Sequence, residues 1–261
     1  MCYSIQQLEE RIRKQGLRNR STPAEIEQAI ELFRKQQLGK PFFIASGFDH
    51  PTLPVLIRSE GQLEFQPMQW GLIPHFVEDS KQANEWSNIT LNARGETMFD
   101  KPAFRQAARQ HRGLLLVTGF YEYHHDGKRK TPHFVDWSDE QARLVAVIFD
   151  HWNHPTEQFE YTSFSIVTCG ANPFMAALHH GTGELGPRMP LFLHGEHLLT
   201  WINPDSTQEE IQRLVRSDDE DGIRSHAVRP LRGKQAVGNT ALASAAWVDG
   251  AQNEQLRLFG F

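Results

Sequence analysis

The strand-like segments of this chain outnumber its helical segments and do not alternate with them, which constrains the fold more than any other feature. Short runs rich in Val, Ile, Phe and Tyr, bounded by Gly, Pro, Asp or Asn, predict strands. They lie at Pro41–Phe48, Pro54–Arg58, Gln62–Met68, Leu114–Val117, Arg143–Phe149 and Tyr161–Thr168. Strands without alternating crossover helices favour antiparallel pairing over a doubly wound sheet. The pattern predicts an α+β fold with a predominantly antiparallel, barrel-like β core and peripheral helices.

Helical periodicity is confined to fewer stretches. Residues 5–15 and 23–38 are predicted helices, and the second has Pro23 in its first turn with Ile26 and Ile30 on one face. Shorter helices are predicted at Pro102–Gln110, Pro173–His179 and Thr207–Arg216. We find no internal repeat and no linker long enough to split the chain, so we expect a single domain over residues 1–235 and a tail over 236–261.

Composition excludes several classes of protein. No run of about 18 apolar residues is present, and the N-terminus lacks the apolar core of a signal peptide, so we expect a cytoplasmic protein with no membrane partner. The 2 cysteines are too few for a disulfide framework or a cysteine-rich zinc site. We expect no metal and no cofactor. The G-x-G-x-x-G at residues 181–186 lacks the preceding strand that a dinucleotide fingerprint needs.

Cys2 is the residue with the most distinctive chemistry. Initiator methionine is usually removed before a small residue, and removal of Met1 would leave Cys2 with a free α-amine beside its thiol. These groups ordinarily titrate at about 7.7–8 and about 8.5, so both react near neutral pH. With an aldehyde, the amine forms an imine and the thiol closes onto its carbon as a thiazolidine. Taken alone, Cys2 is better explained as a small residue at a frayed chain end.

Five further blocks give Cys2 a context. In chain order they are Trp70-Gly-Leu-Ile-Pro74, Asn92-Ala-Arg94-Gly-Glu96-Thr97 followed by Phe104-Arg105, Gly119-Phe-Tyr-Glu122-Tyr123, Ala171-Asn172 leading to Leu178-His179, and Arg188-Met-Pro190. With the leading Met1-Cys2, their order and approximate spacing resemble the SRAP family, the SOS-response-associated abasic-site processing proteins. The resemblance covers roughly residues 2–235.

The resemblance implies a fold and an activity. It implies a single SRAP-like α+β domain that binds single-stranded DNA and crosslinks covalently to abasic sites, whose ring-opened sugar carries an aldehyde. It also implies AP-lyase activity through the imine and a self-processing peptidase activity. On this basis we expect a DNA-repair enzyme that works as a monomer without a cofactor, in the cytoplasm and on the nucleoid when bound to DNA.

The resemblance also implies roles for single residues. Cys2 matches the nucleophile, and Asn92 matches the Asn whose amide holds the amine or the sugar. Glu122 matches a proton-shuttling carboxylate, although a strand-end ion pair is an alternative. His179 matches the His that assists opening of the sugar ring, a role that suits a side chain titrating near neutral pH. His180 is a competitor for that role.

Four residues are predicted to contact DNA. Arg94 and Arg188 match phosphate-binding arginines, since a guanidinium can hold phosphate through two hydrogen bonds. Trp70 and Phe76 would offer flat surfaces for stacking bases, with core packing as the alternative for each. Further basic residues could extend the groove, namely Arg105, Arg109, Arg112, Lys128, Arg129 and Lys130.

The chain departs from the family pattern in three places. Tyr3 and Ser4 replace a common Gly-Arg pair, which removes one early phosphate contact. Tyr123 stands where a Trp is usual. The segment His180–Pro187 is longer than its family counterpart and adjoins both His179 and Arg188, so the roles of these two residues depend on its course.

The end of the chain carries a separate signal. Gln255–Phe259 (QLRLF) resembles the short peptides with which bacterial proteins dock on the replication sliding clamp, and a strand returning to the core is the alternative. Two other functions remain open for the chain as a whole. One is an N-terminal-nucleophile cysteine hydrolase, with Cys2 attacking a carbonyl and His179 as base. The other is a noncatalytic module that binds single strands.

Overall fold

A computed structural model describes residues 2–7, 23–35, 41–126, 129–179, 186–217 and 222–247. The strands are β1 (Ser4–Gln7), β2 (Phe42–Ser46), β3 (Thr52–Ser59), β4 (Gln62–Trp70), β5 (Asn92–Arg94), β6 (Arg112–Val117), β7 (Gly119–Asp126), β8 (Arg129–Trp137), β9 (Arg143–Asn153), β10 (Glu160–Gly170), β11 (Arg188–Pro190), β12 (Phe192–Leu193) and β13 (Ile223–Ala227). The helices are α2 (Ala24–Lys35), α3 (Ser80–Ile89), α4 (Arg105–Gln110), α5 (Pro173–Leu178), α6 (Glu196–Ile202) and α7 (Gln208–Leu214), with short 3-10 turns η1 (Gly47–Asp49) and η2 (Ala241–Ser244).

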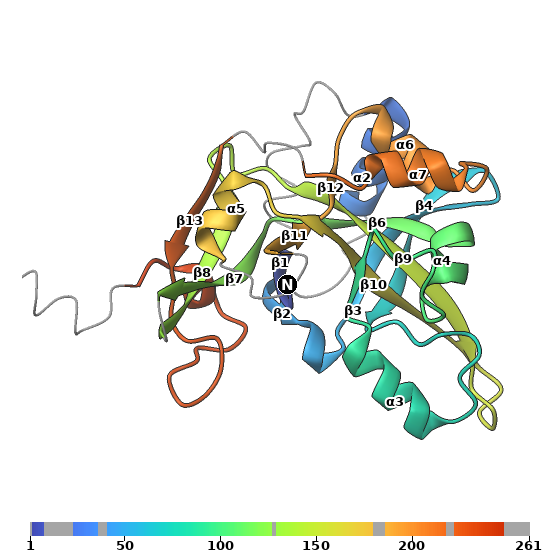
Figure 1. The fold of residues 1–261 in the computed structure, drawn as a ribbon, viewed down its shortest axis with the longest axis horizontal. Coiled ribbons are helices and arrows are strands. Elements are labelled where there is room, and N and C mark those ends of the chain that lie inside the picture. Colours follow the sequence, from blue (N-terminus) through green and yellow to red (C-terminus); the bar gives the residue numbers. More distant parts are fainter. Residues whose placement is uncertain are drawn as a thin grey trace, which may run out of the picture.

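Five strands close into a small barrel. Strand β3 pairs with β4 and with β6, β6 pairs with β9, β9 pairs with β10, and β10 returns to β4. All these pairings are antiparallel except β4–β10. Helices α2, α4 and α6 pack outside the barrel against β4, β9 and β6 (Figure 1). Both faces of β6 and of most of β9 are therefore covered, which explains their nearly continuous apolar runs.

A second, antiparallel sheet lies beside the barrel, with strand order β13-β8-β7-β1-β2. Strand β7 follows β6 after one residue, Thr118, whose backbone N–H donates to the carbonyl of Gln6 on β1. Aromatic contacts from Phe120 and Trp137 to Phe192 join this sheet to the barrel side. In Figure 1, β7, β8 and β13 lie to the left of the barrel, and β1 lies between these strands and the barrel.

The α+β class and the mainly antiparallel, barrel-like core are confirmed, as are the six predicted strands, with small shifts at their ends. The four helices predicted from residue 23 onward are present as α2, α4, α5 and α7, somewhat shorter than predicted. Strands β7 and β8 pair antiparallel, with Asp126 opposite Arg129.

The prediction of a helix at residues 5–15 is wrong at its start. Residues 4–7 form β1, which is hydrogen-bonded on both sides, to β2 and to β7. The amide of Gln7 donates to the Leu116 carbonyl and that of Gln6 to the Ser244 hydroxyl, so both polar side chains are buried with partners. Pairing with distant strands overrides the local helical pattern here. Residues 8–15 lie outside the described residues.

Part of the predicted tail packs on the domain. Asn239 accepts hydrogen bonds from the backbone N–H groups of Phe43 and Ile44 on β2, and Ala243 lies in a buried cluster with Tyr121 and Phe134. Residues 248–261, with the proposed clamp peptide, lie outside the described residues. In the described part of the chain, no helix is long and apolar enough to cross a membrane.

Candidate active site

Cys2 lies two residues before β1 and belongs to the main buried core cluster. Its side chain is completely buried, and Sγ lies 3.7 Å from the carbonyl oxygen of Ser4. Burial raises the pKa of the Cys2 thiol to about 12, and the nearby Glu122 carboxylate acts in the same direction. The thiol is therefore neutral in this chain, which still carries Met1, and it lies within the electrostatic reach of Glu122.

Glu122 and His179 form a buried acid–imidazole pair. Glu122 lies on β7, where its Oε1 accepts a hydrogen bond of 3.1 Å from the Tyr123 backbone N–H. The Nδ1 atom of His179 lies 3.4 Å from the same oxygen, and the two side chains are 17% and 5% exposed for His179 and Glu122. A carboxylate beside an imidazole can accept a proton from one bound group and deliver it to another.

The end of helix α5 delivers His179 to this pair. Asn172 caps the helix, its Oδ1 accepting from the Met175 backbone N–H at 2.9 Å, and Pro173 occupies the first turn. His179 follows the last helical residue. The ring of His124 on β7 lies 3.0 Å from the carbonyl oxygen of Leu178, which ties the end of α5 to the strand that carries Glu122.

Asn92 has an amide that no described residue satisfies. It lies on β5, opposite Ile166 of β10. Its Oδ1 and Nδ2 atoms are both buried, and neither has a hydrogen-bond partner among the described residues. Leaving such a group unpaired costs about 1–3 kcal/mol, so an orphaned amide needs an explanation such as a ligand. An amide can both donate to and accept from a hydroxylated or amine-bearing ligand.

Gly47 packs β1 against the segment that leads to Asn92. Its backbone N–H donates to the Tyr3 carbonyl at 2.9 Å. A Cβ at Gly47 would lie 3.0 Å from Cε2 of Trp70 and 3.2 Å from Cδ2 of Leu91, which leaves little room for a side chain. The residue after Cys2 and the residue before Asn92 therefore meet around one glycine.

Trp70 belongs to the core and does not offer a stacking surface. Its side chain is fully buried, its ring is stacked with Phe164 at 6.2 Å between centroids, and its Nε1 donates to the Leu91 carbonyl at 2.8 Å. This corrects the expectation that Trp70 contacts bases: core packing, the alternative, is what the burial supports. The indole supports the backbone beside Asn92.

Phe76, in contrast, reaches solvent and is 42% exposed. Its ring packs edge-on against Trp86, with 5.9 Å between centroids. Its neighbour His75 is anchored by the buried Asp150, whose Oδ2 lies 2.9 Å from His75 Nδ1 and accepts from the His75 backbone N–H at 3.0 Å. The base contact predicted for Phe76 stays a prediction, and the exposure leaves room for it.

The two predicted phosphate-binding arginines differ in their surroundings. Arg94 is exposed at the end of β5. Arg188 is 5% exposed, and its Nη2 donates to Glu96 Oε2 at 2.6 Å and to the Thr168 carbonyl at 2.7 Å. Nothing in the sequence pattern identifies Thr168 as a hydrogen-bond partner of Arg188. A phosphate would have to compete with Glu96 for Arg188.

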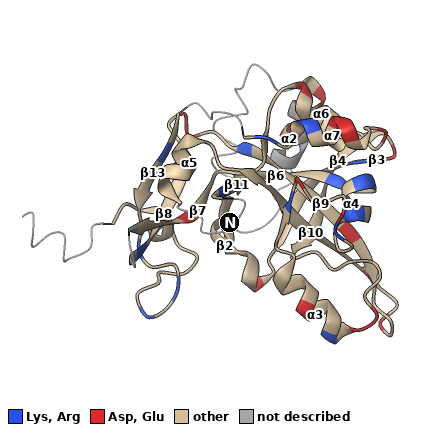
Figure 2. Cartoon of the chain, viewed as in Figure 1, with Lys and Arg blue, Asp and Glu red and all other residues tan. Residues whose placement is uncertain are grey.

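The other basic residues are scattered. The guanidinium of Arg112 is buried against backbone carbonyls, among them those of Trp201 and Asn203, so it forms part of the fold. Helix α4, with Arg105 and Arg109, lies on the opposite side of the molecule from β7 and α5 (Figure 2). Lys128 and His180 lie outside the described residues, as does most of the segment from His180 to Pro187.

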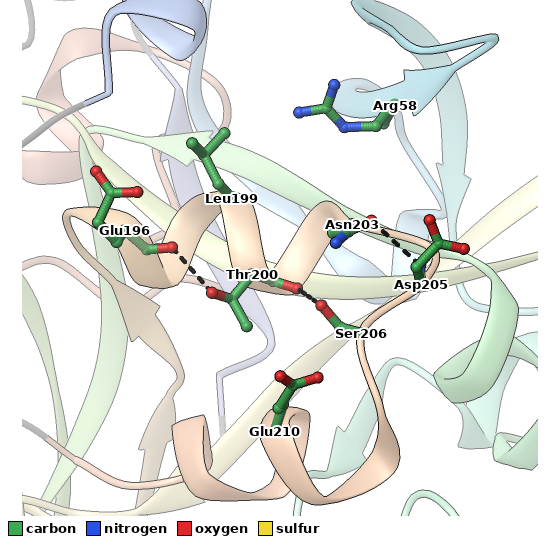
Figure 3. A pocket seen from close by; sticks show the side chains of 8 residues that line it. All are labelled: Arg58, Glu196, Leu199, Thr200, Asn203, Asp205, Ser206 and Glu210. Carbon is green, nitrogen blue, oxygen red and sulfur yellow. Dashed lines mark hydrogen bonds between the residues drawn. The ribbon is translucent and has the colours of Figure 1, made fainter.

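A surface cavity of about 530 Å³ lies between α6, α7 and Arg58, away from β7 and α5 (Figure 3). Its lining is polar and includes the carboxylates of Glu196, Asp205 and Glu210. In the part of the chain that the structure describes, no group of three or more His, Cys, Asp or Glu side chains is arranged to hold a metal ion.

Comparisons with known proteins agree with this fold. Residues 16–235 match the family described as SOS response associated peptidase (SRAP). The chain is 28% identical over 218 residues to the abasic site processing protein YoqW of Bacillus subtilis (strain 168), covering 80% of this chain and 90% of that protein. It is also 28% identical over 171 residues to the abasic site processing protein HMCES of Gallus gallus, covering 57% and 48% of the two chains. A crystal structure of a protein from Bacteroides thetaiotaomicron matches 95% of this chain and 100% of its own, with a TM-score of 0.76 and 25% identity.

Proposed function

Because the chain belongs to the SOS response associated peptidase (SRAP) family, we propose that it processes abasic sites in single-stranded DNA by forming a covalent crosslink through Cys2. The proposal is supported by the pairing of β1 with β7, in which Ser4 lies opposite Tyr121, next to Glu122. Cys2 lies two residues before Ser4, and Oε1 of Glu122 lies 3.4 Å from Nδ1 of His179. The relatives named abasic site processing proteins supply the substrate class.

The proposed chemistry joins three groups without an oxidant or a cofactor. After removal of Met1, the α-amine of Cys2 attacks the aldehyde carbon of the ring-opened abasic sugar, and loss of one water gives an imine. The thiol sulfur then adds to the imine carbon, and the thiol proton ends on the nitrogen. The product is a thiazolidine that links protein to DNA, and the net change is the release of one water.

The residues around Cys2 suit the proton transfers that these steps require. Glu122 would take a proton from the attacking amine and help water leave. His179 would donate a proton to the sugar oxygen that is released when the ring opens. The orphaned amide of Asn92 would hold the amine or a sugar hydroxyl. Holding amine, thiol and aldehyde together replaces an improbable encounter with a near-unimolecular reaction.

Removal of Met1 is a step that this proposal requires. The Cys2 thiol is fully buried in the chain that retains Met1. Cleavage at Met1 would create the amine on the reacting residue itself. The family's self-processing peptidase activity would serve this step, and Glu122 and His179 are the adjacent groups that could activate water.

The imine offers a second outcome on DNA. Loss of a proton from the sugar carbon next to the imine, with departure of the 3′ phosphate, would cleave the strand by β-elimination. Closure of the thiazolidine removes the imine and therefore opposes this lyase reaction. The balance between shielding and cleavage would depend on how quickly the Cys2 sulfur adds.

General amide hydrolysis through a Cys2 thiolate gains no support from the geometry. A hydrolase of that class needs a thiolate at neutral pH, whereas in the chain that retains Met1 burial raises the pKa of the Cys2 thiol to about 12. Addition of the thiol to an imine that has already formed depends less on a thiolate, because the thiol proton can pass to the imine nitrogen.

The crosslink can be tested with an abasic single strand on a denaturing gel. Wild type should form a stable adduct, and Cys2→Ala should form none unless borohydride is added to reduce its imine. Protein with one extra residue before Cys2 should form no stable adduct, since its amine lies elsewhere. Reversible binding that is unaffected by Cys2→Ala would support a noncatalytic module, and peptide cleavage without any adduct would support the hydrolase.

The tail peptide would bring the protein to replication forks. Gln255–Phe259 would dock on the sliding clamp by placing its apolar side chains in a preformed pocket. Binding of the clamp should be measurable for the full chain and lost when residues 254–261 are deleted. Equal binding by both proteins would rule out this tether without affecting the proposed crosslink.

A further inference from the structure

An aromatic and cationic cluster lies directly beside Cys2. The ring of Tyr3 contacts that of Phe48, with 5.1 Å between centroids. The guanidinium carbon of Arg232 lies 4.6 Å from the Phe48 ring centroid. Phe48 remains 41% exposed, and Arg232 is exposed as well. Three residues from separate parts of the chain thus form one surface, here called the Tyr3–Phe48–Arg232 platform.

The platform is held rigidly. Phe48 lies in η1, whose first residue, Gly47, donates its backbone N–H to the Tyr3 carbonyl at 2.9 Å. The turn ends at His50, which has a left-handed backbone conformation with φ of 47°. Its Nδ1 atom lies 2.8 Å from the Trp70 carbonyl oxygen. The exposure of Phe48 is therefore a property of an ordered turn.

The platform also lies at the candidate active site. Tyr3 is bonded to Cys2, and Gly47 packs against Leu91, which precedes Asn92. Burial raises the pKa of Tyr3, with a further contribution from the charge of Glu122. The charge of Arg232 in turn acts on Tyr123, the neighbour of Glu122. These couplings agree with a platform at the rim of the cluster formed by Cys2, Glu122 and His179.

The guanidinium of Arg232 forms no ion pair within the ranges that the structure describes, and its contact there is with Phe48. The loop from 228 to 240, after β13, contains Arg229, Arg232 and Lys234 and no Asp or Glu. Figure 2 shows the basic segments of this loop. A cation that meets no carboxylate and lies beside an exposed aromatic ring suits an anion that carries a flat apolar group, which describes a nucleotide.

We propose that the Tyr3–Phe48–Arg232 platform binds a nucleotide next to the abasic site, the base packing on Phe48 and the guanidinium while Arg232 contacts the adjoining phosphate. This inference rests on the proposed function and deepens it. It also accounts for the Tyr3-Ser4 start of the chain. Where the family commonly has Gly-Arg, Tyr3 supports Phe48, and Arg232 supplies the cation from another segment.

The test measures noncovalent binding to a single strand in which a tetrahydrofuran replaces the abasic sugar, so that no aldehyde is present. Phe48→Ala should weaken binding by about five- to 150-fold, the range for loss of one stacked base. Arg232→Gln should weaken binding and reduce the slope of log Kobs against log salt by about 0.7, the value for one phosphate contact on a single strand.

Matched controls separate the platform from general effects. Arg213→Gln removes another exposed guanidinium, on α7. Phe159→Ala removes a phenylalanine that is 48% exposed elsewhere. Both controls should bind as wild type does. Phe48→Leu keeps an apolar side chain and removes the ring, so it should retain stability and still weaken binding if Phe48→Ala proves unstable.

The outcomes distinguish the platform from the chemistry. Wild-type affinity and salt slope in the folded Phe48 and Arg232 variants would overturn the platform, even if the aldehyde-bearing strand still crosslinks. Selective losses in these variants, together with no crosslink by the wild type, would uphold the platform and overturn the proposed chemistry. No binding by the wild type would overturn both.

Discussion

The Nδ1 atom of His179 lies 3.4 Å from Oε1 of Glu122, so the end of a short helix and a strand of the second sheet meet at one buried acid–imidazole contact. The same strand pairs with β1, the strand that Cys2 precedes. The three side chains come from three elements, and β7 contacts the other two through hydrogen bonds. Substitutions on β7 should therefore affect the whole cluster of Cys2, Glu122 and His179.

Glu122→Gln should slow crosslinking by about 100- to 10,000-fold while leaving the fold intact. The amide keeps an oxygen that can accept from the Tyr123 N–H, but it cannot take up a proton. Single-turnover crosslinking rates would measure the loss. Glu64→Gln, on an exposed position of β4, is the matched control and should react at the wild-type rate. A Glu122→Gln protein that also reacts at that rate would exclude the proposed proton transfer.

The stability of protein that retains Met1 should fall with rising pH because of Cys2. The thiol of the unfolded chain loses its proton near the ordinary cysteine pKa of 9.0, whereas burial in the folded chain raises that pKa to about 12. Between these values the unfolded state binds fewer protons, so the free energy of unfolding falls as pH rises, by at most about 1.4 kcal/mol per pH unit. Cys2→Ala lacks this dependence. Urea unfolding of both proteins from about pH 8 to about pH 11, a range that spans the onset of this titration, would show it as a difference, and parallel curves would contradict the buried thiol.

Asn92→Leu should abolish efficient crosslinking without lowering stability. The amide of Asn92 is buried and has no partner among the described residues, so replacing it with an apolar group of similar size removes a desolvation cost of about 1–3 kcal/mol. Asn172→Leu provides the contrast, since its amide caps α5 and its loss should cost about 1 kcal/mol. Thermal unfolding and crosslinking rates would be measured for both variants. An Asn92→Leu protein that is strongly destabilised would mean that the amide has a structural partner.

The sequence predicted the barrel well because its strands carry their own signal. The apolar runs that became β6 and β9 are rich in Leu and Val and covered on both faces, so local composition and burial agree. The N-terminal strand was missed for the opposite reason. Ser4–Gln7 has no strand signal of its own, and its conformation comes from pairing with β2 and β7.

The candidate site was predictable in residue type and not in environment. The resemblance to a family singled out Cys2, Glu122 and His179. In the structure the strand that follows Cys2 pairs with β7, and Glu122 of β7 lies next to His179. The same resemblance could not tell that Trp70 is buried. Nor could it tell that Arg188 is already bonded, because a guanidinium's partners depend on contacts across β10 and β11 that leave no trace in residue spacing.

Glu96→Gln should strengthen binding of single-stranded DNA if Arg188 contacts a phosphate. In the free protein the Glu96 carboxylate lies 2.6 Å from Nη2 of Arg188, and it is 40% exposed, so a phosphate can approach only by competing with it. The neutral amide competes less, and the repulsion between carboxylate and phosphate disappears. We expect an affinity gain of about two- to tenfold at low salt, from roughly 0.4–1.4 kcal/mol of reduced repulsion. Fluorescence anisotropy with a labelled strand would measure it. In the Glu96→Gln protein, a second substitution, Arg188→Lys, should abolish the gain in affinity, because an ammonium cannot bond Thr168 and a phosphate in the same geometry. Unchanged affinity in Glu96→Gln would assign Arg188 to the fold alone and leave Arg94 as the phosphate contact of this edge of the sheet.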